Sequence, residues 1–149
     1  MKVEILSIEV SKCYPLRHKM LRKGKPLETC HFDGDNSKGT FHLGALIDKE
    51  IIGIISVYEK DLTQFENSKG AQFRGIAVAS KYQRKGVASK LINYAQKETI
   101  KRINPKYIWL NGRISANNLY LDRGFKPIGN PFEINTIGIH QRFIKMISG

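Results

Sequence analysis

The chain has 149 residues, 41% of them hydrophobic, which is the length and composition of one globular domain and not of a disordered segment. Its formal net charge is +12, from 25 Lys and Arg against 13 Asp and Glu, so it should attract anions such as nucleic acid, anionic lipid or phosphorylated small molecules. No run approaches the ~18 apolar residues of a membrane span, and the N-terminus lacks a signal-peptide core, so we expect a soluble cytoplasmic protein.

The first half of the chain predicts a strand, a helix and a β-hairpin. β-branched residues at period two indicate the strand, and Pro15 suits the first turn of the helix that Gly24 ends. Cys13 and Cys30 are the only cysteines, and we expect free thiols. The expected elements are a strand at Val3–Val10, a helix from Pro15 to Gly24, a loop at Cys30–Thr40, and paired strands at Phe41–Asp48 and Glu50–Glu59.

The second half alternates strands and helices. Gly75 inside a strand predicts a bulge or a close approach by another backbone or a ligand. Ser115 and Gly124 are expected to cap the two ends of a short helix. The expected elements are strands at Ala71–Ser80, Lys106–Gly112, Phe125–Gly129 and Thr136–Ile147, and helices at Gly86–Ile103 and Ser115–Gly124. This order predicts one α/β (α+β) domain over residues 1–149, built on a mixed sheet.

The loop before the long helix has the properties of an anion site. A helix start presents unpaired N–H groups and a partial positive charge. Gly86 has no Cβ to keep a ligand off the backbone, Ala88 is small, and Arg84 and Lys85 add full charges. These features suit a diphosphate, although a basic loop that binds only water would look the same, and neither a P-loop nor a dinucleotide-binding motif is present.

Two segments resemble the GNAT superfamily of N-acetyltransferases. "IAVASKYQRKGVASKLI" is similar to its acetyl-CoA signature, with Gln83, Gly86 and Ala88 at the fixed positions. "ANNLYLDRGF" is similar to its later helix, and further segments resemble a branch of small bacterial GNAT proteins. The resemblance implies a mostly antiparallel sheet flanked by helices, with a V-shaped splay between two strands. It also implies an N-acetyltransferase that uses acetyl-CoA as cosubstrate and no metal.

The resemblance assigns roles to individual residues. Tyr120 matches a tyrosine that often protonates the leaving CoA thiolate, and the alternative role is a ring that only packs under the cofactor. Lys81, Lys85 or Lys90 would meet the 3′-phosphate of CoA. The backbone of the strand would bind the pantetheine arm, and the loop and first helical turn would bind the pyrophosphate. These cofactor-binding residues are Ile76, Ala77, Val78, Gln83, Arg84, Lys85, Gly86, Val87, Ala88 and Ser89.

The sequence departs from the family at the general base. Some relatives place a glutamate where this chain has Gln72, which cannot act as a base. Glu59, Glu133, His140 or a water chain would then take the proton. Arg74, Arg113 and His140 are candidate substrate residues, because arginine binds a carboxylate in a bidentate way. The same convergence on an acidic group of the acceptor would extend to Arg17, Arg22 and His42, and the alternative for each is a surface charge or an internal ion pair.

Several questions stay open at this stage. A CoA-binding sensor or scaffold without turnover is one alternative function, because a fold does not fix an activity. A basic nucleic-acid-binding module is another, although no RRM, KH, zinc-finger or helix-turn-helix signature is present. Polyamine, amino acid, aminoglycoside and protein N-terminus all remain candidate acceptors. Family members are often dimers, so the resemblance also allows a homodimer.

Overall fold

The computed structural model describes residues 2–65, 67–135 and 137–147. The strands are β1 (Glu4–Ser7), β2 (Phe41–Ile47), β3 (Glu50–Glu59), β4 (Gly70–Val78), β5 (Tyr107–Arg113), β6 (Lys126–Ile134) and β7 (Gly138–Met146). The α-helices are α1 (Tyr14–Leu16), which continues as a π-helix over Arg17–Leu21, α2 (Val87–Arg102) and α3 (Asn117–Leu121). Within these residues no helix is both long and apolar enough to cross a membrane.

All seven strands belong to one sheet, in the order β1-β2-β3-β4-β5-β7-β6. Every neighbouring pair is antiparallel except β4 and β5, which run parallel and are joined by α2. The predicted β2–β3 hairpin is confirmed, with Asp48 and Lys49 both at positive φ in its two-residue turn. The predicted α/β class with a mixed, mostly antiparallel sheet is therefore confirmed.

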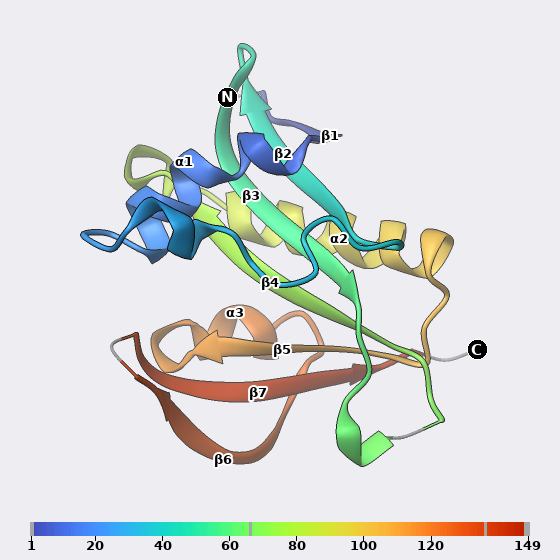
Figure 1. The fold of residues 1–149 in the computed structure, drawn as a ribbon. Helices are drawn as coiled ribbons and strands as arrows, with labels where there is room; N and C mark the ends of the chain where they lie inside the picture. Colours follow the sequence, from blue (N-terminus) through green and yellow to red (C-terminus); the bar gives the residue numbers. More distant parts are fainter. Residues whose placement is uncertain (1, 66, 136, 148–149) are drawn as a thin grey trace.

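β4 and β5 separate after a short stretch of pairing. Gly70–Phe73 pairs with Tyr107–Leu110, but beyond this register β4 pairs only with β3 and β5 only with β7. The two strands form a V in Figure 1, closed at the right of the view and open at the left. Past Phe73, the edge of β4 that faces β5 has no partner strand among the described residues, so the expected splay is present.

A bulge bends β4 within the splay. Ile54 pairs with Ala77 and Ser56 with Arg74, so Gly75 and Ile76 together oppose one residue of β3. Gly75 has a φ of +65°, and a Cβ there would lie 3.2 Å from the ring of Phe32. The predicted bulge is therefore present, and the close neighbour of Gly75 is an aromatic side chain instead of the backbone or ligand that was expected.

The helices cover both faces of the first half of the sheet. α1 lies in front of β3 and α2 behind it in Figure 1. The core between α2 and the sheet includes Val87, Leu91 and Ile92 against Leu43 and Ile55. Ile100, although apolar, does not share this face. It is 44% exposed and Thr99 is buried instead, because the buried positions recur every four residues at Leu91, Ala95 and Thr99.

Several predicted boundaries move. The first strand covers only Glu4–Ser7, and the first helix ends at Leu21 as a π-helix, before Gly24. Ser115 does not cap α3, because a 3₁₀ turn occupies Ile114–Ala116 and the helix starts one turn later. The strand predicted at Phe125–Gly129 extends to Ile134, with a register shift in the middle of β6, and the predicted start of the last strand at Thr136 lies outside the described residues.

Candidate active site

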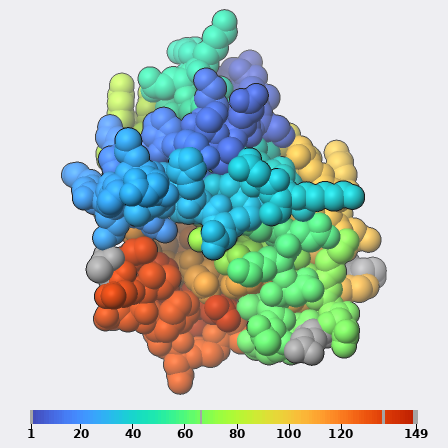
Figure 2. Space-filling model, viewed as in Figure 1, coloured from blue at the N-terminus to red at the C-terminus, as the bar shows by residue number. Residues whose placement is uncertain are grey.

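A cavity of about 330 Å³ occupies the opening between β4 and β5. Its walls come from both strands, from α3 and β7, and from the end of the π-helix and the segment after it, including Leu21 and Phe32. Figure 2 shows this face of the molecule hollowed between the blue N-terminal segment and the red C-terminal strands. Residues far apart in the sequence therefore meet at one concave site, the usual setting for a small-molecule ligand.

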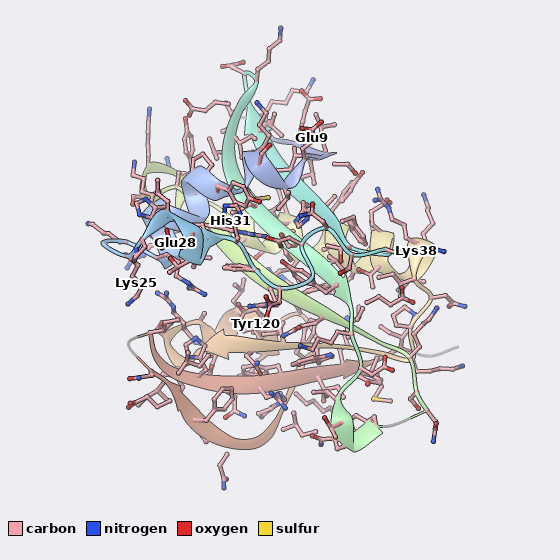
Figure 3. The ribbon with its side chains drawn as sticks, viewed as in Figure 1. Glu9, Lys25, Glu28, His31, Lys38 and Tyr120 are labelled. Carbon is pink, nitrogen blue, oxygen red and sulfur yellow. The ribbon has the colours of Figure 1, made fainter. Side chains whose placement is uncertain are left out.

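Tyr120 lies at the wall of this cavity. The side chain is 6% exposed and its ring packs against Phe125 and Phe143. Gly112 on β5 makes room for the ring, since a Cβ there would lie 3.0 Å from Cδ2 and closer still to Cε2. Burial raises the pKa of Tyr120 to about 12, so the phenol keeps its proton at physiological pH. Figure 3 shows Tyr120 in the opening between β4 and β5.

The basic loop predicted to bind an anion leads into a helix start whose amides are free. Gly86 is the N-cap of α2 at a φ of +82°, with no side-chain cap, and a Cβ there would meet nothing within 4 Å. Arg84 also has positive φ, at 61°. Among the described residues, no backbone amide of residues 84–89 donates a hydrogen bond to a carbonyl or a side chain. Free amides around a residue without a Cβ fit a diphosphate.

Most of the predicted cofactor-binding residues line a second cavity, of about 210 Å³, over this helix start. Ile76 faces the larger cavity instead, and Ala77 and Lys85 line neither. The Gln83 side chain folds back and donates from Nε2 to the carbonyl of Val78 at 3.0 Å. The predicted residues that line the smaller cavity are Val78, Gln83, Arg84, Gly86, Val87, Ala88 and Ser89.

The two cavities are lined by different residues of the same two elements, β4 and α3. Ile76 lines the larger cavity and Val78 the smaller one, both from the unpaired part of β4. On α3, Leu119 lines the smaller cavity and Tyr120 the larger. An extended ligand with its diphosphate at the helix start would therefore run along β4 and end beside Tyr120.

Three arginines gather at the larger cavity. Arg22, Arg74 and Arg113 all line it, so the structure brings together two of the candidate substrate residues with Arg22, which belongs to the wider set expected to converge on the acceptor. The guanidinium carbons of Arg74 and Arg22 lie 4.8 and 5.1 Å from the centre of the Phe32 ring. Arg22 and Arg113 both donate to the carbonyl of Leu21, at 3.1 and 3.5 Å. The three guanidinium groups therefore lie close together on one part of the cavity wall.

Arg17 and His42, the other residues expected to converge on the acceptor, do not line this cavity. Arg17 is fully buried, and its two terminal nitrogens donate to the carboxylate of Asp35 at 2.7 and 3.0 Å. Burial raises the pKa of Asp35, but hydrogen bonds from Arg17 and Tyr58 outweigh this and hold it below its usual value. His42 joins the same network through Ser56, at 2.6 Å. For these two residues the internal-pair interpretation fits the structure.

The candidate general bases differ in their surroundings. Gln72 lines the larger cavity, is 5% exposed, and its Oε1 has no hydrogen-bond partner among the described residues. Glu59 pairs with Lys69 at 3.2 Å and Glu133 is exposed on β6, and neither lines the cavity. His140 does line it, and its Nδ1 lies 2.9 Å from the carbonyl of Gly138. A carbonyl accepts from a ring N–H, so in the neutral ring Nε2 holds the lone pair.

Sequence reasoning missed part of the wall. Phe32 comes from a predicted loop and Leu21 from the predicted helix Pro15–Gly24, and neither composition gave a sign that these segments cover the site. Arg123 was also missed, although it precedes Gly124 in a segment already singled out. Its Nη2 donates to Ser89 at the start of α2, which brings a further positive charge to the smaller cavity. Among the described residues no cluster of His, Cys, Asp or Glu is placed to hold a metal ion.

A family model described as "Acetyltransferase (GNAT) domain" matches residues 26–146. The chain belongs to the GNAT acetyltransferase family. A relative in Bacillus subtilis (strain 168), the uncharacterized N-acetyltransferase YitI, is 30% identical over 138 residues, which are 93% of this chain and 92% of that protein. This GNAT protein is accordingly an acyltransferase enzyme, and N-acetyl transfer is the general activity of its family.

Solved structures agree on the fold. ElaA of Escherichia coli is 13% identical, with a TM-score of 0.78 over 97% of this chain and 99% of its own. NAA60 of Arabidopsis thaliana, solved in complex with acetyl-CoA, is 15% identical, with a TM-score of 0.74 over 99% of this chain and 100% of its own. At these identities the likeness concerns the arrangement of strands and helices.

Proposed function

We propose that this GNAT protein transfers the acetyl group of acetyl-CoA directly to a primary amine. The observation that carries the proposal is the pairing of two features across the β4–β5 splay. One is the set of free amides at residues 84–89 over the open space at Gly86, and the other is a protonated, buried Tyr120 at the adjoining cavity. An anion site joined to a proton donor is what a CoA thioester needs.

Different segments of the chain would bind different parts of CoA. The amides of the loop and the α2 N-terminus, with Arg84, would bind the pyrophosphate, and the unpaired edge of β4 from Ile76 to Val78 would bind the pantetheine amides. Ser89 and Arg123 lie at the same helix start, and Lys81, Lys85 or Lys90 would meet the 3′-phosphate. The Gln83 side chain is already bonded to Val78, so it would shape the loop and would not touch phosphate.

The chemical step needs one proton removed and one supplied. Acetyl-CoA supplies a thioester carbonyl, at which a C–N bond forms to the amine and the C–S bond breaks. Tyr120 would donate to the departing sulfur, since its pKa of about 12 keeps the phenol protonated. His140, with Nε2 as its free lone pair, is the candidate acceptor for the amine proton, either directly or through water.

Two measurements test the proposal. Millimolar CoA should raise the melting temperature, because a ligand that binds only the folded state stabilises it. With acetyl-CoA and a panel of primary amines, free CoA thiol and an acetylated product should appear, and Tyr120→Phe should lower kcat about 100-fold while keeping the CoA shift. The absence of a CoA shift would contradict the proposal. A shift with no product from any amine would favour the CoA-binding sensor instead.

A further inference from the structure

The larger cavity is positively charged and contains no acid. Its lining includes Arg22, Arg74, Arg113 and His140, and not one Asp or Glu among the described residues. The chain has 13 acidic residues, so their absence from this wall is not a result of general scarcity. A cavity that concentrates one sign of charge attracts ligands of the opposite sign.

The three arginines have no acidic partner in the described part of the chain. Among the described residues, none of them forms a salt bridge, and the hydrogen bonds of Arg22 and Arg113 go to one backbone carbonyl. Asp35 lies nearby, but both of its oxygens accept from Arg17, which stacks on the same Phe32 ring at 4.0 Å. The carboxylate of Asp35 is therefore already paired with a buried arginine.

Holding these charges together has a cost that an anion would relieve. Burial lowers the pKa of Arg22, and the charges of Arg74 and Arg113 lower it further. Phe32 keeps Arg22 and Arg74 in place through cation–π contacts, so the guanidinium groups are ordered before a ligand arrives. A pre-ordered cluster of guanidinium groups is suited to bidentate binding of a carboxylate or phosphate.

We propose that the acceptor is a small primary amine that carries an anionic group, a carboxylate or a phosphate, bound by Arg22, Arg74 and Arg113. This inference rests on the acetyl transfer proposed above. A cavity of about 330 Å³ holds a small molecule of amino-acid size. Gln72 Oε1, a buried acceptor without a donor, lies on the same wall and would accept from the N–H of the amine. Polyamines and other polycationic acceptors are disfavoured by the same charges.

The experiment compares acceptors that differ only in the acidic group. Glycine, phenylalanine and glutamate are each assayed beside the matching carboxamide, and O-phosphoethanolamine beside ethanolamine, by release of CoA thiol and by the mass of the product. We expect kcat/KM to be about 10- to 100-fold higher for the anionic member of at least one pair, as hydrogen bonds to charged groups imply. The amino acid and phosphate arms tell which anion is preferred.

Arginine variants test whether the preference for anionic acceptors comes from Arg22, Arg74 and Arg113. Arg74→Met and Arg113→Met should raise the KM for the anionic acceptor about 10-fold or more and leave the KM of its neutral partner little changed. Arg102→Met is the matched control, because Arg102 stacks on Phe41 at 4.4 Å but lies on α2 away from the cavity. Arg113 is exposed, so Arg113→Glu should fold and should shift the preference toward a diamine such as putrescine.

A second readout does not depend on turnover. N-acetylglycine and N-acetylglycinamide are titrated into the CoA complex by calorimetry, and the carboxylate should bind more tightly in the wild type but not in Arg74→Met. Neutral and anionic amines acetylated equally well would overturn the inference and leave the acetyltransferase proposal standing. If no amine is acetylated, the acetyltransferase proposal fails, and equal binding of the two N-acetyl ligands would then overturn the anion site as well.

Discussion

Gly112→Ala should test whether the position of Tyr120 matters for the reaction. The new Cβ would lie 3.0 Å from Cδ2 of the ring and closer to Cε2, and 3.2 Å from Leu110 Cδ1. Carbon atoms in contact normally stay about 3.5–4.0 Å apart, so the ring must move by roughly 1 Å. The other side of the Tyr120 ring packs against Phe125 and Phe143, so the ring would move toward the cavity.

Two effects of this shift are expected. Overpacking should lower the free energy of unfolding by about 1–3 kcal/mol. Displacing a catalytic hydroxyl by about 1 Å should lower kcat by up to ~100-fold, close to the effect of Tyr120→Phe. The first is measured by urea denaturation, and the second by steady-state release of CoA thiol at a temperature where the variant is fully folded.

Gly70→Ala is the matched control. Gly70 is also a strand glycine beneath a buried tyrosine, and a Cβ there would lie 2.6 Å from two ring atoms of Tyr107. Tyr107 lines neither cavity of the candidate site. We therefore expect Gly70→Ala to lose similar stability with kcat unchanged. If Gly112→Ala is destabilised to the same degree and also keeps its kcat, the reasoning that Tyr120 acts from this position is refuted.

Three further predictions concern stability and cofactor binding. Asp35→Asn leaves Arg17 as an unpaired buried charge and should lower the free energy of unfolding by about 3–5 kcal/mol. Glu98→Gln, at a surface pair, should lower it by under about 1 kcal/mol. Both values are measured by urea denaturation. Because folding raises the pKa of Tyr120 to about 12, the unfolded chain loses that proton first. Stability should thus fall as pH rises from about 10 to 12, and Tyr120→Phe should flatten this fall in melting curves. Gly86→Ala, at a φ of +82°, should place a methyl group over the free amides and raise the Kd of CoA about tenfold in calorimetry, and an unchanged Kd would argue against a diphosphate there.

The sequence predicted the part of the fold that depends on local pattern. Period-two strands, the hairpin at Asp48-Lys49 and the long helix starting at Gly86 each carry their own signal, and the structure has all three. The π-helix at Arg17–Leu21 could not be predicted, because it follows from the contacts of a fully buried arginine. The extended β6 was missed because Pro127 and Pro131 argue against a strand, and β6 tolerates them at the edge of the sheet.

Some parts of the candidate site could be predicted from the sequence and others could not. The helix start at residues 84–89 was accessible because strand, basic loop, glycine and helix are contiguous in the sequence. The sequence indicated six candidate acceptor-binding residues, four arginines and two histidines, but did not divide them into a cavity group and a buried network. What separates them is Asp35, a loop residue that pairs with Arg17, so that Arg22 and Arg74 have no carboxylate partner among the described residues. Only the tertiary structure decides which cation a single carboxylate satisfies.

A substitution at Gln72 tests this arrangement of charges most directly. Some relatives have a glutamate at this position, so Gln72→Glu would be expected to restore a general base and raise activity. In this cavity the new carboxylate would instead face Arg74 and Arg113 and take the place of the anionic group of the acceptor. In the wild type, the positive charges of the three arginines would also lower the pKa of the bound ammonium group of the acceptor. The amine would then lose its proton without a carboxylate base.

We therefore expect Gln72→Glu to lower kcat/KM for an acidic amine about tenfold, mainly through KM, with little change for the matching neutral amine. Gln72→Met, which removes the amide without adding charge, separates the loss of a hydrogen bond from the effect of the carboxylate. Both variants are assayed with the same pair of acceptors and with CoA binding as a folding check. A higher kcat/KM for the acidic amine in Gln72→Glu would show that proton removal, and not binding of the anionic group, limits the reaction, and the role given to the arginines would fall with it.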